Sequence, residues 1–450
     1  MSSSVATGEP SVSYAYDAMG RVAAITNALG ETIVYAYDTL GNRISERGAT
    51  YPVDYEYDLY GNKVAMTTYR DESLDYPNGL TASWTYDANN QLIQVRNATP
   101  SAIISQYDYT YDAAGRRIAC THTGDAFTQS DTFNYAYNTK NELTNAVAVA
   151  DASYTYAYDF DEIGNRRTSS ECGVRSAEYA ANELNQYTAI STDTSALFVS
   201  PRETFTPLFD ADGNQTLVKT ATGIWTVTYN GENRPILWTC GVTNITMSYD
   251  RMGRRVTKND QRFVYDGYLQ IANRHSTSTP TPLTYTYFIW DPTEPVATRP
   301  LVWLNSALDT PHTALYYAHD GNKNVSEVIA QDGDIAAHYE YAPFGAVTAQ
   351  SGALAMANPW RFSSEFADDE LGCDYYNYRE YEPVAGRWMQ RDPIYDEDGA
   401  FDRGVYAFCG NTAMFRFDSL GLKIVFNENS ILKDYSGPKK ERGFMSHSPL

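Results

Sequence analysis

The sequence predicts an all-β fold, a spiral of β-hairpins that forms a hollow shell. Three observations predict it: a short tyrosine-aspartate motif recurs along the chain, 38 of the 450 residues are tyrosine, and 29 glycines and 19 prolines supply turns. Aromatic residues favour strands, and glycine and proline favour the turns between them. A hydrophobic fraction of 43% is enough for a folded chain, so general disorder is not expected.

The repeated motif has clear and weaker copies, and most neighbouring copies are 20 to 29 residues apart. The clear copies are YAYDAMGRV from Tyr14, YAYDTLGNRI from Tyr35, YEYDLYGNKV from Tyr55, YDYTYDAAGRRI from Tyr107, YAYDFDEIGNRR from Tyr156 and MSYDRMGRRV from Met247. The weaker copies begin at Trp84, Tyr135, Leu208 and Val227. Self-similarity at such a period indicates a repeat architecture.

Each copy predicts one β-hairpin. In the first copy, Tyr14 and Tyr16 lie two residues apart and therefore share one face of a strand. Asp17 then opens a turn, and Gly20 suits the turn position where φ is often positive. The return strand begins with Arg21, and an arginine here can lie over a neighbouring tyrosine ring, a contact of roughly 0.5–2 kcal/mol. Successive hairpins are expected to stack their tyrosines across strands.

The number of hairpins predicts the spiral. Roughly fifteen units give on the order of thirty strands at about 4.8 Å spacing, whereas twisted open sheets rarely exceed about 10 strands. A ribbon of this length has to coil on itself, and a coiled ribbon encloses a hollow. The alternative is a series of separate β-sandwiches, but no Pro/Ser linker lies between the repeats.

Composition and spacing exclude several classes of function. The net charge of −22 argues against nucleic-acid binding by the shell, which would need a cationic surface. The five cysteines form no CxxC pair and the six histidines no HExxH motif, so we expect no metal and no other cofactor. Neither a GxSxG elbow nor a P-loop occurs, and no metabolic enzyme activity is expected. No apolar run approaches the ~20 residues of a membrane span, and the start lacks a signal-peptide pattern.

The YDxxGN/R units resemble the YD repeats of the Rhs/teneurin family, and the resemblance covers most of residues 12–422. The C-terminal third is its most specific part. Segments 314–347, 361–393 and 405–422 resemble the opening, the centre and the end of the Rhs repeat-associated core. The central segment, RFSSEFADDELGCDYYNYREYEPVAGRWMQRDP, is similar to the family pattern YYxxRYYDPxxGRWxxRDP.

The resemblance implies three parts: a YD-repeat β-shell over residues 1–313, an Rhs repeat-associated core over 314–422 that closes one end, and a short C-terminal tail over 423–450. It also implies the encapsulating scaffold of a bacterial polymorphic toxin system, a monomer whose shell holds a C-terminal toxin payload or its own tail. The chain itself carries no export signal that we recognise, and the resemblance implies a secreted or cell-surface protein.

The resemblance further implies one reaction, autoproteolysis of the aspartyl type just after the core. The matching residues here are Asp392, Asp418 and Leu422, which precedes the bond to be cut. Arg391 and Arg387 belong to the same elements and complete the set of expected catalytic residues. Two carboxylates near one peptide can divide the work, one activating water and one donating a proton to the leaving amine.

This chain departs from the family pattern DPxG at both aspartates. Tyr395 stands where glycine follows Asp392, and Ser419 stands where proline follows Asp418. Whether self-cleavage is active is therefore open. The alternative interpretation is that both residues are ordinary turn aspartates like Asp38.

The tail after Leu422 has 28 residues, five of them basic and three acidic, and no cysteine. So short a segment rarely folds alone, and we do not expect a complete toxin domain there. The tail is either a remnant, a plug of the shell or the start of a payload. Two other functions stay open: a cell-surface module that binds carbohydrate through exposed tyrosine-rich faces, and a payload-less fragment of a longer Rhs protein.

Overall fold

The computed structural model describes residues 12–26, 32–48, 52–68, 79–151, 153–173, 175–193, 203–275, 285–292, 299–305, 313–393 and 404–426. These residues form 37 strands, and their only helical segments are two 3-10 turns, η1 (Phe362–Ser364) and η2 (Phe408–Asn411). The prediction of an all-β fold is confirmed. Tyr395 and most of the tail after Leu422 lie outside the described residues.

The first sheet is a 17-stranded meander in which each strand pairs antiparallel with the next. Its strands are β1 (Ser13–Tyr16), β2 (Val22–Thr26), β3 (Thr32–Tyr37), β4 (Arg43–Arg47), β5 (Pro52–Tyr57), β6 (Lys63–Thr68), β7 (Leu80–Tyr86), β8 (Leu92–Ala98), β9 (Ile103–Tyr111), β10 (Arg117–Thr123), β11 (Asp131–Tyr137), β12 (Leu143–Ala148), β13 (Thr155–Phe160), β14 (Arg166–Glu171), β15 (Arg175–Ala181), β16 (Tyr187–Asp193) and β17 (Glu203–Phe205).

The second sheet is a 14-stranded meander of the same kind. Its strands are β18 (Leu208–Phe209), β19 (Gln215–Thr220), β20 (Gly223–Tyr229), β21 (Pro235–Cys240), β22 (Thr243–Tyr249), β23 (Arg255–Lys258), β24 (Gln261–Asp266), β25 (Leu269–His275), β26 (Tyr285–Trp290), β27 (Pro300–Asn305), β28 (Thr313–His319), β29 (Val325–Ile329), β30 (Ile335–Tyr341) and β31 (Val347–Ser351). The expected boundary between residues 313 and 314 falls at the start of β28, and the sheet runs across that position.

Two small sheets complete the chain. One contains β32 (Phe366–Asp368), β33 (Cys373–Tyr376), β34 (Arg379–Glu382) and β35 (Arg387–Trp388), and the other contains β36 (Arg416–Ser419) and β37 (Lys423–Phe426). They belong to the expected core and are much shorter than the strands of the meanders.

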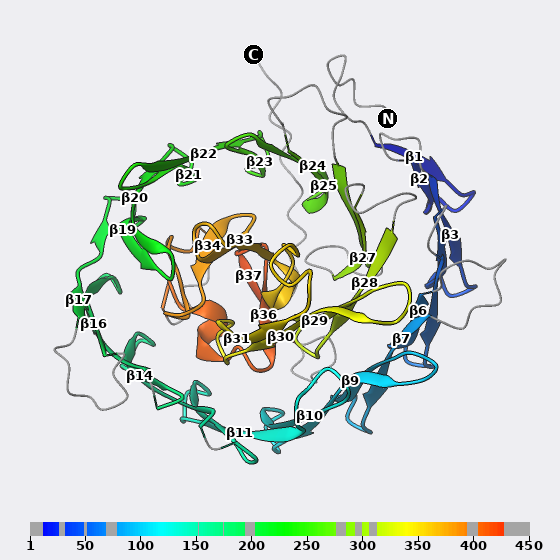
Figure 1. Ribbon diagram of the computed structural model, residues 1–450, viewed down its shortest axis with the longest axis horizontal. Coiled ribbons are helices and arrows are strands. Elements are labelled where there is room, and N and C mark those ends of the chain that lie inside the picture. The colour runs from blue at the N-terminus through cyan, green and yellow to red at the C-terminus, as the bar shows by residue number, and fades with distance from the viewer. Residues whose placement is uncertain are drawn as a thin grey trace, which may run out of the picture.

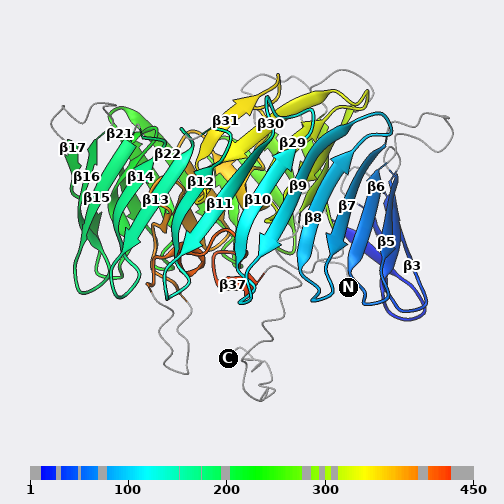
Figure 2. The same ribbon diagram turned by 90° about the horizontal axis from the view of Figure 1, so that it is seen from below.

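The strands are arranged as a spiral. In Figure 1 the strands β1–β24 follow one another around a ring, and the chain then turns inward, so that β28–β31 and the small sheets lie inside it. Figure 2 shows the strands of the ring side by side and tilted between two rims. The ring closes where the Tyr14 hydroxyl of β1 donates to the Asp266 carboxylate of β24. The predicted spiral shell of hairpins is confirmed, and its interior takes in the C-terminal core.

The turns of the ring have the predicted chemistry, as the hairpin at Asp58 illustrates. The Gly61 N–H donates to the Asp58 carbonyl over 3.1 Å, and φ of Gly61 is 84°. One carboxylate oxygen of Asp58 accepts the N–H of Tyr60 and of Asn62, and the other accepts the Asn62 side-chain amide over 2.8 Å. The aspartate thus holds its own turn closed.

In many hairpins, a tyrosine directly before the turn connects its hairpin to the preceding one. The Tyr57 hydroxyl donates to the Arg43 carbonyl over 2.9 Å, and the Tyr111 hydroxyl donates to the Leu92 carbonyl over 2.6 Å. Corresponding bonds are made by Tyr37, Tyr86, Tyr137, Tyr229, Tyr249 and Tyr341. Besides the backbone pairing of neighbouring strands, the tyrosine side chains link hairpins by hydroxyl–carbonyl bonds more than by the ring stacking that the sequence predicts.

The predicted arginine–ring contacts are present on the inner face of the ring. The Arg43 guanidinium carbon lies 4.0 Å from the centre of the Tyr35 ring, and that of Arg117 lies 3.8 Å from Tyr109. Arg166 is 3% exposed and lies between Tyr158 of the ring and Phe344 of the inner segment, 4.6 and 4.4 Å from their centres. A basic residue of the repeat here helps to hold the inner segment.

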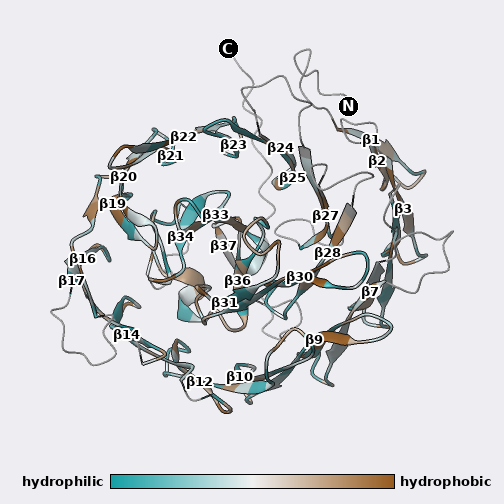
Figure 3. Ribbon diagram, viewed as in Figure 1, coloured by the Kyte–Doolittle hydropathy of each residue, from teal (hydrophilic) through white to brown (hydrophobic). Residues whose placement is uncertain are grey.

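The hydrophobic core lies between the ring and the segment inside it. One cluster packs Leu143 and Tyr158 of the ring against Tyr381 and Phe408, and another packs Trp225 and its neighbours against Leu371, Cys373 and Met389. Hydrophobic and hydrophilic residues are mixed in both layers, as Figure 3 shows, because alternate side chains of each strand face the core. This packing fixes the position of the C-terminal core within the ring.

Candidate functional site

The C-terminal elements inside the ring bring the two predicted aspartates to one arginine. Arg379 is the first residue of β34, Asp392 follows β35, and Asp418 lies in β36. The Arg379 Nη2 atom is 3.0 Å from Asp392 Oδ2 and 3.2 Å from Asp418 Oδ2. One guanidinium therefore bridges two carboxylates that are 26 residues apart in the sequence.

The same groups hold the peptide unit directly before the predicted cleavage bond. The Leu422 N–H donates to Asp418 Oδ1 over 2.8 Å, and Arg379 Nε donates to the Gly421 carbonyl over 2.6 Å. The Tyr378 N–H also donates to the carbonyl of Leu420, over 3.1 Å. Both polar groups of the Gly421–Leu422 peptide are thus held by side chains of the site.

The turn that presents this peptide is tight. Gly421 has φ of 71°, and a Cβ atom there would lie 3.2 Å from the Arg379 nitrogen and the Tyr376 carbonyl oxygen. Leu420 also has a positive φ, 65°, which a leucine rarely adopts. Glycine at position 421 allows the chain to lie against β34, as the family pattern implies.

The site is largely shielded from water. The side chains of Arg379 and Asp418 are each 2% exposed, and that of Asp392 is 28% exposed. Arg379 lies over the Trp388 ring, 4.0 Å from its centre. Burial lowers the pKa of Arg379, and the charges of Asp418 and Asp392 oppose that shift. Two carboxylates and one guanidinium leave the cluster with excess negative charge when all three are ionised.

A third carboxyl group lies near this cluster. Burial raises the pKa of Glu365 well above its usual range, and the charge of Asp418 raises it further. Glu365 directly precedes β32 and belongs to the core. Sequence analysis did not select it.

The two predicted arginines are directed to the ring. Arg387 donates to the Asn185 carbonyl and to Asn165 Oδ1, and its guanidinium carbon lies 4.0 Å from the centre of the Tyr187 ring. Arg391 is exposed, and its side-chain carbons lie beside Gly213 of the ring. The structure thus brings together Asp392, Asp418 and Leu422, and it places Arg387 and Arg391 against the ring.

Arg379 is the residue of the site that sequence reasoning missed. The signal was present, because the family pattern YYxxRYYDP contains an arginine at this position, within YYNYREYEP of this chain. The expectation instead relied on arginines close in sequence to Asp392. A lysine would supply the charge but not two donors in a fixed fork, which here reach a carbonyl and two carboxylates.

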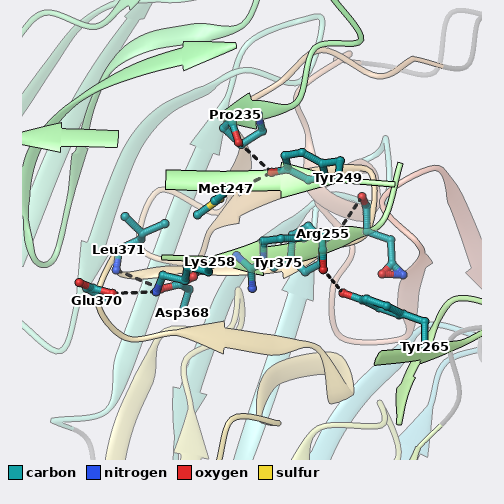
Figure 4. A network of polar contacts seen from close by, with 11 residues as sticks. Pro235, Met247, Tyr249, Arg255, Lys258, Tyr265, Asp368, Glu370, Leu371 and Tyr375 are labelled. Carbon is teal, nitrogen blue, oxygen red and sulfur yellow. Dashed lines mark hydrogen bonds and ion pairs between the residues drawn. The ribbon is translucent and has the colours of Figure 1, made fainter. Parts of the chain in front are cut away.

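A second buried charged cluster joins the core to the ring, as Figure 4 shows. Asp368 of the core lies 3.1 Å from Arg255 and 2.5 Å from Lys258, both in β23 of the ring. The Tyr375 hydroxyl accepts the Arg255 backbone N–H over 2.8 Å. The cluster stabilises the contact of the two layers.

In the described part of the chain, no group of three or more His, Cys, Asp or Glu side chains is arranged to bind a metal ion. Among the same residues, no helix has the length and apolarity to cross a membrane. The five cysteines, all of them described, form no disulfide.

The repeat, the ring and the enclosed core define a class, the β-shell repeat proteins. A family model described as RHS Repeat matches residues 16–52. The crystal structure of TcdB2-TccC3 superposes with a TM-score of 0.69 over 93% of this chain and 22% of that chain, at 18% identity. The Photorhabdus luminescens Tc holotoxin pore gives a TM-score of 0.66 over 91% of this chain and 21% of that chain, at 17% identity. These similarities show a shared fold.

Three named relatives are similar to this chain in sequence. Double-stranded DNA deaminase toxin A of Burkholderia cenocepacia (strain H111) is 29% identical over 212 residues, 41% of this chain and 14% of the relative. The tRNA3(Ser)-specific nuclease WapA of Bacillus spizizenii is 24% identical over 358 residues, 78% of this chain and 12% of the relative. Toxin subunit YenC1 of Yersinia entomophaga is 24% identical over 464 aligned residues, 85% of this chain and 44% of the relative.

The repeat match, the relatives and the shared shell fold all relate the chain to the Rhs/YD-repeat proteins. The chain spans only a small part of the first two relatives, 14% and 12% of their length.

Proposed function

We propose that the protein is the encapsulating shell of a toxin system and that the ring surrounds a C-terminal payload or the chain's own tail. The supporting observation is that β36 and β37, the strands directly before and after Leu422, lie inside the ring (Figure 1). Relatives named as toxins and a nuclease carry the same repeat pattern on much longer chains. By the same similarity, we propose that the protein acts outside the cell that makes it.

We further propose that the shell cuts itself after Leu422. The observation that carries this proposal is the convergence of Asp392 and Asp418 on Arg379, beside the held Gly421–Leu422 peptide. Asp392 is the more exposed carboxylate and activates the attacking water. Asp418 and Arg379 orient the chain so that the Leu422 carbonyl meets this water, and positioning of this kind accounts for large rate effects.

Arg387 and Arg391 take a different part in this proposal. Their contacts with the ring hold β35 and the segment around Asp392 at a fixed place relative to the wall. We therefore assign them to positioning of Asp392. Substitution of Arg387 by methionine is expected to slow self-cleavage less than substitution of Asp392 by asparagine.

The test is an intact-mass measurement of the full chain. The wild-type protein is expected to appear as a fragment that ends at Leu422 and a 28-residue peptide, 423–450. Asp392→Asn is expected to remain whole, and Asp38→Asn, in a turn of the ring, to be cut like the wild type. Intact wild-type mass, or cutting of the Asp392→Asn protein, contradicts the proposal.

Encapsulation is tested on the same samples. The released peptide is expected to elute with the shell in native size-exclusion chromatography and to separate from it in denaturant. A peptide that separates from a folded shell under native conditions contradicts encapsulation without affecting the cleavage proposal.

A further inference from the structure

A small cavity lies beside the turn that carries the predicted cleavage bond. It has a volume of about 30 Å³ and is lined by Leu420, two residues before Leu422, together with Glu365 and Gln270. Aromatic side chains, among them Trp290 and Trp360, form much of its remaining wall. The cavity therefore joins strand β25 of the second sheet to the core at the cleavage turn.

Gln270 presents an unsatisfied donor at this place. The residue is 3% exposed, and no acceptor in the described part of the chain reaches its Nε2 atom. Its backbone carbonyl is occupied, because it accepts the Trp290 indole N–H over 2.9 Å. A buried amide N–H without an acceptor is costly, and a cavity of this size with polar groups in its wall has room for one water molecule.

Glu365 supplies a second polar group to the same cavity. Burial raises the pKa of Glu365 well above its usual range, the charges of Asp418 and Asp374 raise it further, and the charge of Lys323 opposes them. Its carboxyl group therefore keeps its proton to higher pH than an exposed carboxyl group and can donate a hydrogen bond or a proton. Asp392 and Asp418 differ from it, because both carboxylates are ion-paired with Arg379.

We propose that the cavity binds one water molecule between Gln270 and Glu365 and supplies water and a proton to the self-cleavage site. This inference rests on the proposed function. Hydrolysis requires a proton donor for the leaving amine, and two carboxylates that are both ion-paired do not readily supply one. Glu365 acts through the bound water and is a positioning residue in this scheme.

The step balances as an ordinary hydrolysis. The water oxygen forms a bond to the Leu422 carbonyl carbon while one water proton passes to the Asp392 carboxylate. The bond from that carbon to the Lys423 nitrogen breaks, and the nitrogen receives a proton that Glu365 releases through the water chain. Asp392 then returns its proton through solvent to Glu365. One water is consumed, and a carboxyl group and an amine are formed.

The experiment follows the rate of cutting during cell-free synthesis of the full chain at pH values from 6.5 to 8.5, with intact mass as readout. Glu365→Gln is expected to cut at least about 10-fold more slowly than wild type, in line with loss of a proton donor. The wild-type rate is expected to fall toward alkaline pH as Glu365 ionises, and the variant is expected to lose that fall. Gln270→Met, which keeps the volume but removes the donor, is expected to be at least about 10-fold slower at every pH.

The matched control is Glu46→Gln. Glu46 is fully buried and burial raises its pKa to about 8, but it lies in β4 of the ring. This variant is expected to cut like the wild type with the wild-type pH profile. Thermal unfolding of each variant shows whether it is folded. If Glu365→Gln does not fold, Gln270→Met tests the proposal in its place.

The outcomes separate the two proposals. If the cavity variants cut at the wild-type rate while Asp392→Asn stays whole, the cavity proposal is wrong and self-cleavage stands. If Asp392→Asn also cuts at the wild-type rate, or the wild type never cuts, the self-cleavage proposal fails and the cavity proposal fails with it.

Discussion

The turns of the ring and the turn at the cleavage site begin in the same way and end differently. Asp58 and Asp418 each accept the backbone N–H four residues later on one carboxylate oxygen. The second oxygen of Asp58 accepts the Asn62 side-chain amide, whereas the residue four after Asp418 is Leu422, whose side chain has no donor. The second oxygen of Asp418 instead reaches Arg379.

This difference teaches how a structural turn becomes a candidate site. Asp418 is both a turn aspartate and a site residue. One oxygen of its carboxylate closes the turn, and the other contacts Arg379. Asp392 differs from both, because its backbone N–H donates to the Val405 carbonyl over 3.0 Å and its side chain reaches Arg379.

The largest effect is expected from the same substitution in the two turns. Asp418→Asn is expected to slow self-cleavage about 100-fold or more, because it removes the charge that pairs with Arg379 and orients the peptide. Asp58→Asn leaves the rate unchanged, since its turn is remote from the core. Intact mass over time measures both, and equal rates in the two variants contradict the assignment of Asp418.

A second comparison concerns the stability contributed by two ion-paired aspartates, one buried between core and ring and one exposed on the ring. Asp368→Ala leaves Arg255 and Lys258 buried without their carboxylate and is expected to cost about 3–5 kcal/mol in the free energy of unfolding. Asp159→Ala removes an ion pair with Arg167 whose side chains are more than half exposed, and is expected to cost under about 1 kcal/mol. Urea titration measures both, and a cost for Asp368→Ala no larger than for Asp159→Ala shows that the cluster does not hold the layers.

Two histidines extend the comparison to pH. Burial opposes the charge of His338 in the inner segment, but hydrogen bonds to Glu327 and Glu340 raise its pKa to about 9. Its pKa is higher in the folded than in the unfolded chain. Its contribution to the free energy of unfolding is therefore complete below pH about 6.5 and is lost as pH rises to about 9. We expect a loss on the order of 2 kcal/mol in the free energy of unfolding over this range.

The control is the His338→Gln variant, which is expected to lack this alkaline loss. The free energy of unfolding of both proteins is compared across the same pH range. Burial lowers the pKa of His122 in the ring, so His122 acts with the opposite sign and reduces stability as pH falls below about 6.5. His122→Gln is expected to change only the acid side of the profile. An alkaline loss of equal size in His338→Gln contradicts the assignment.

The smallest effect is expected from making the cleavage turn resemble a ring turn. Leu422→Asn places an amide where Asn62 stands in the ring, and this amide competes with Arg379 for the second oxygen of Asp418. Self-cleavage is expected to slow about 10-fold, equivalent to about 1.4 kcal/mol. Leu422→Met serves as control and keeps the wild-type rate, and equal rates for the two variants contradict the competition.

Local features of the fold could be read from the sequence, whereas the site could be read only in part. The motif around Asp58 predicts the turn that forms, since its partners lie within four residues. The family pattern selected Asp392 and Asp418, but not the residue that joins them. Arg379 was missed because its role depends on contacts across 13 and 39 residues, and no local rule specifies those.

By itself, the sequence determined the hairpin unit, the all-β class and the need for a long meander to coil, because turn bonds and strand alternation are local and repeat with the motif. Only the tertiary structure decided that Arg387 faces the ring while Arg379 faces two carboxylates, and that Gln270 and Glu365 share a cavity. The physical reason is that side chains distant in sequence meet only when the ring packs around the core, and burial then determines which of them stay charged.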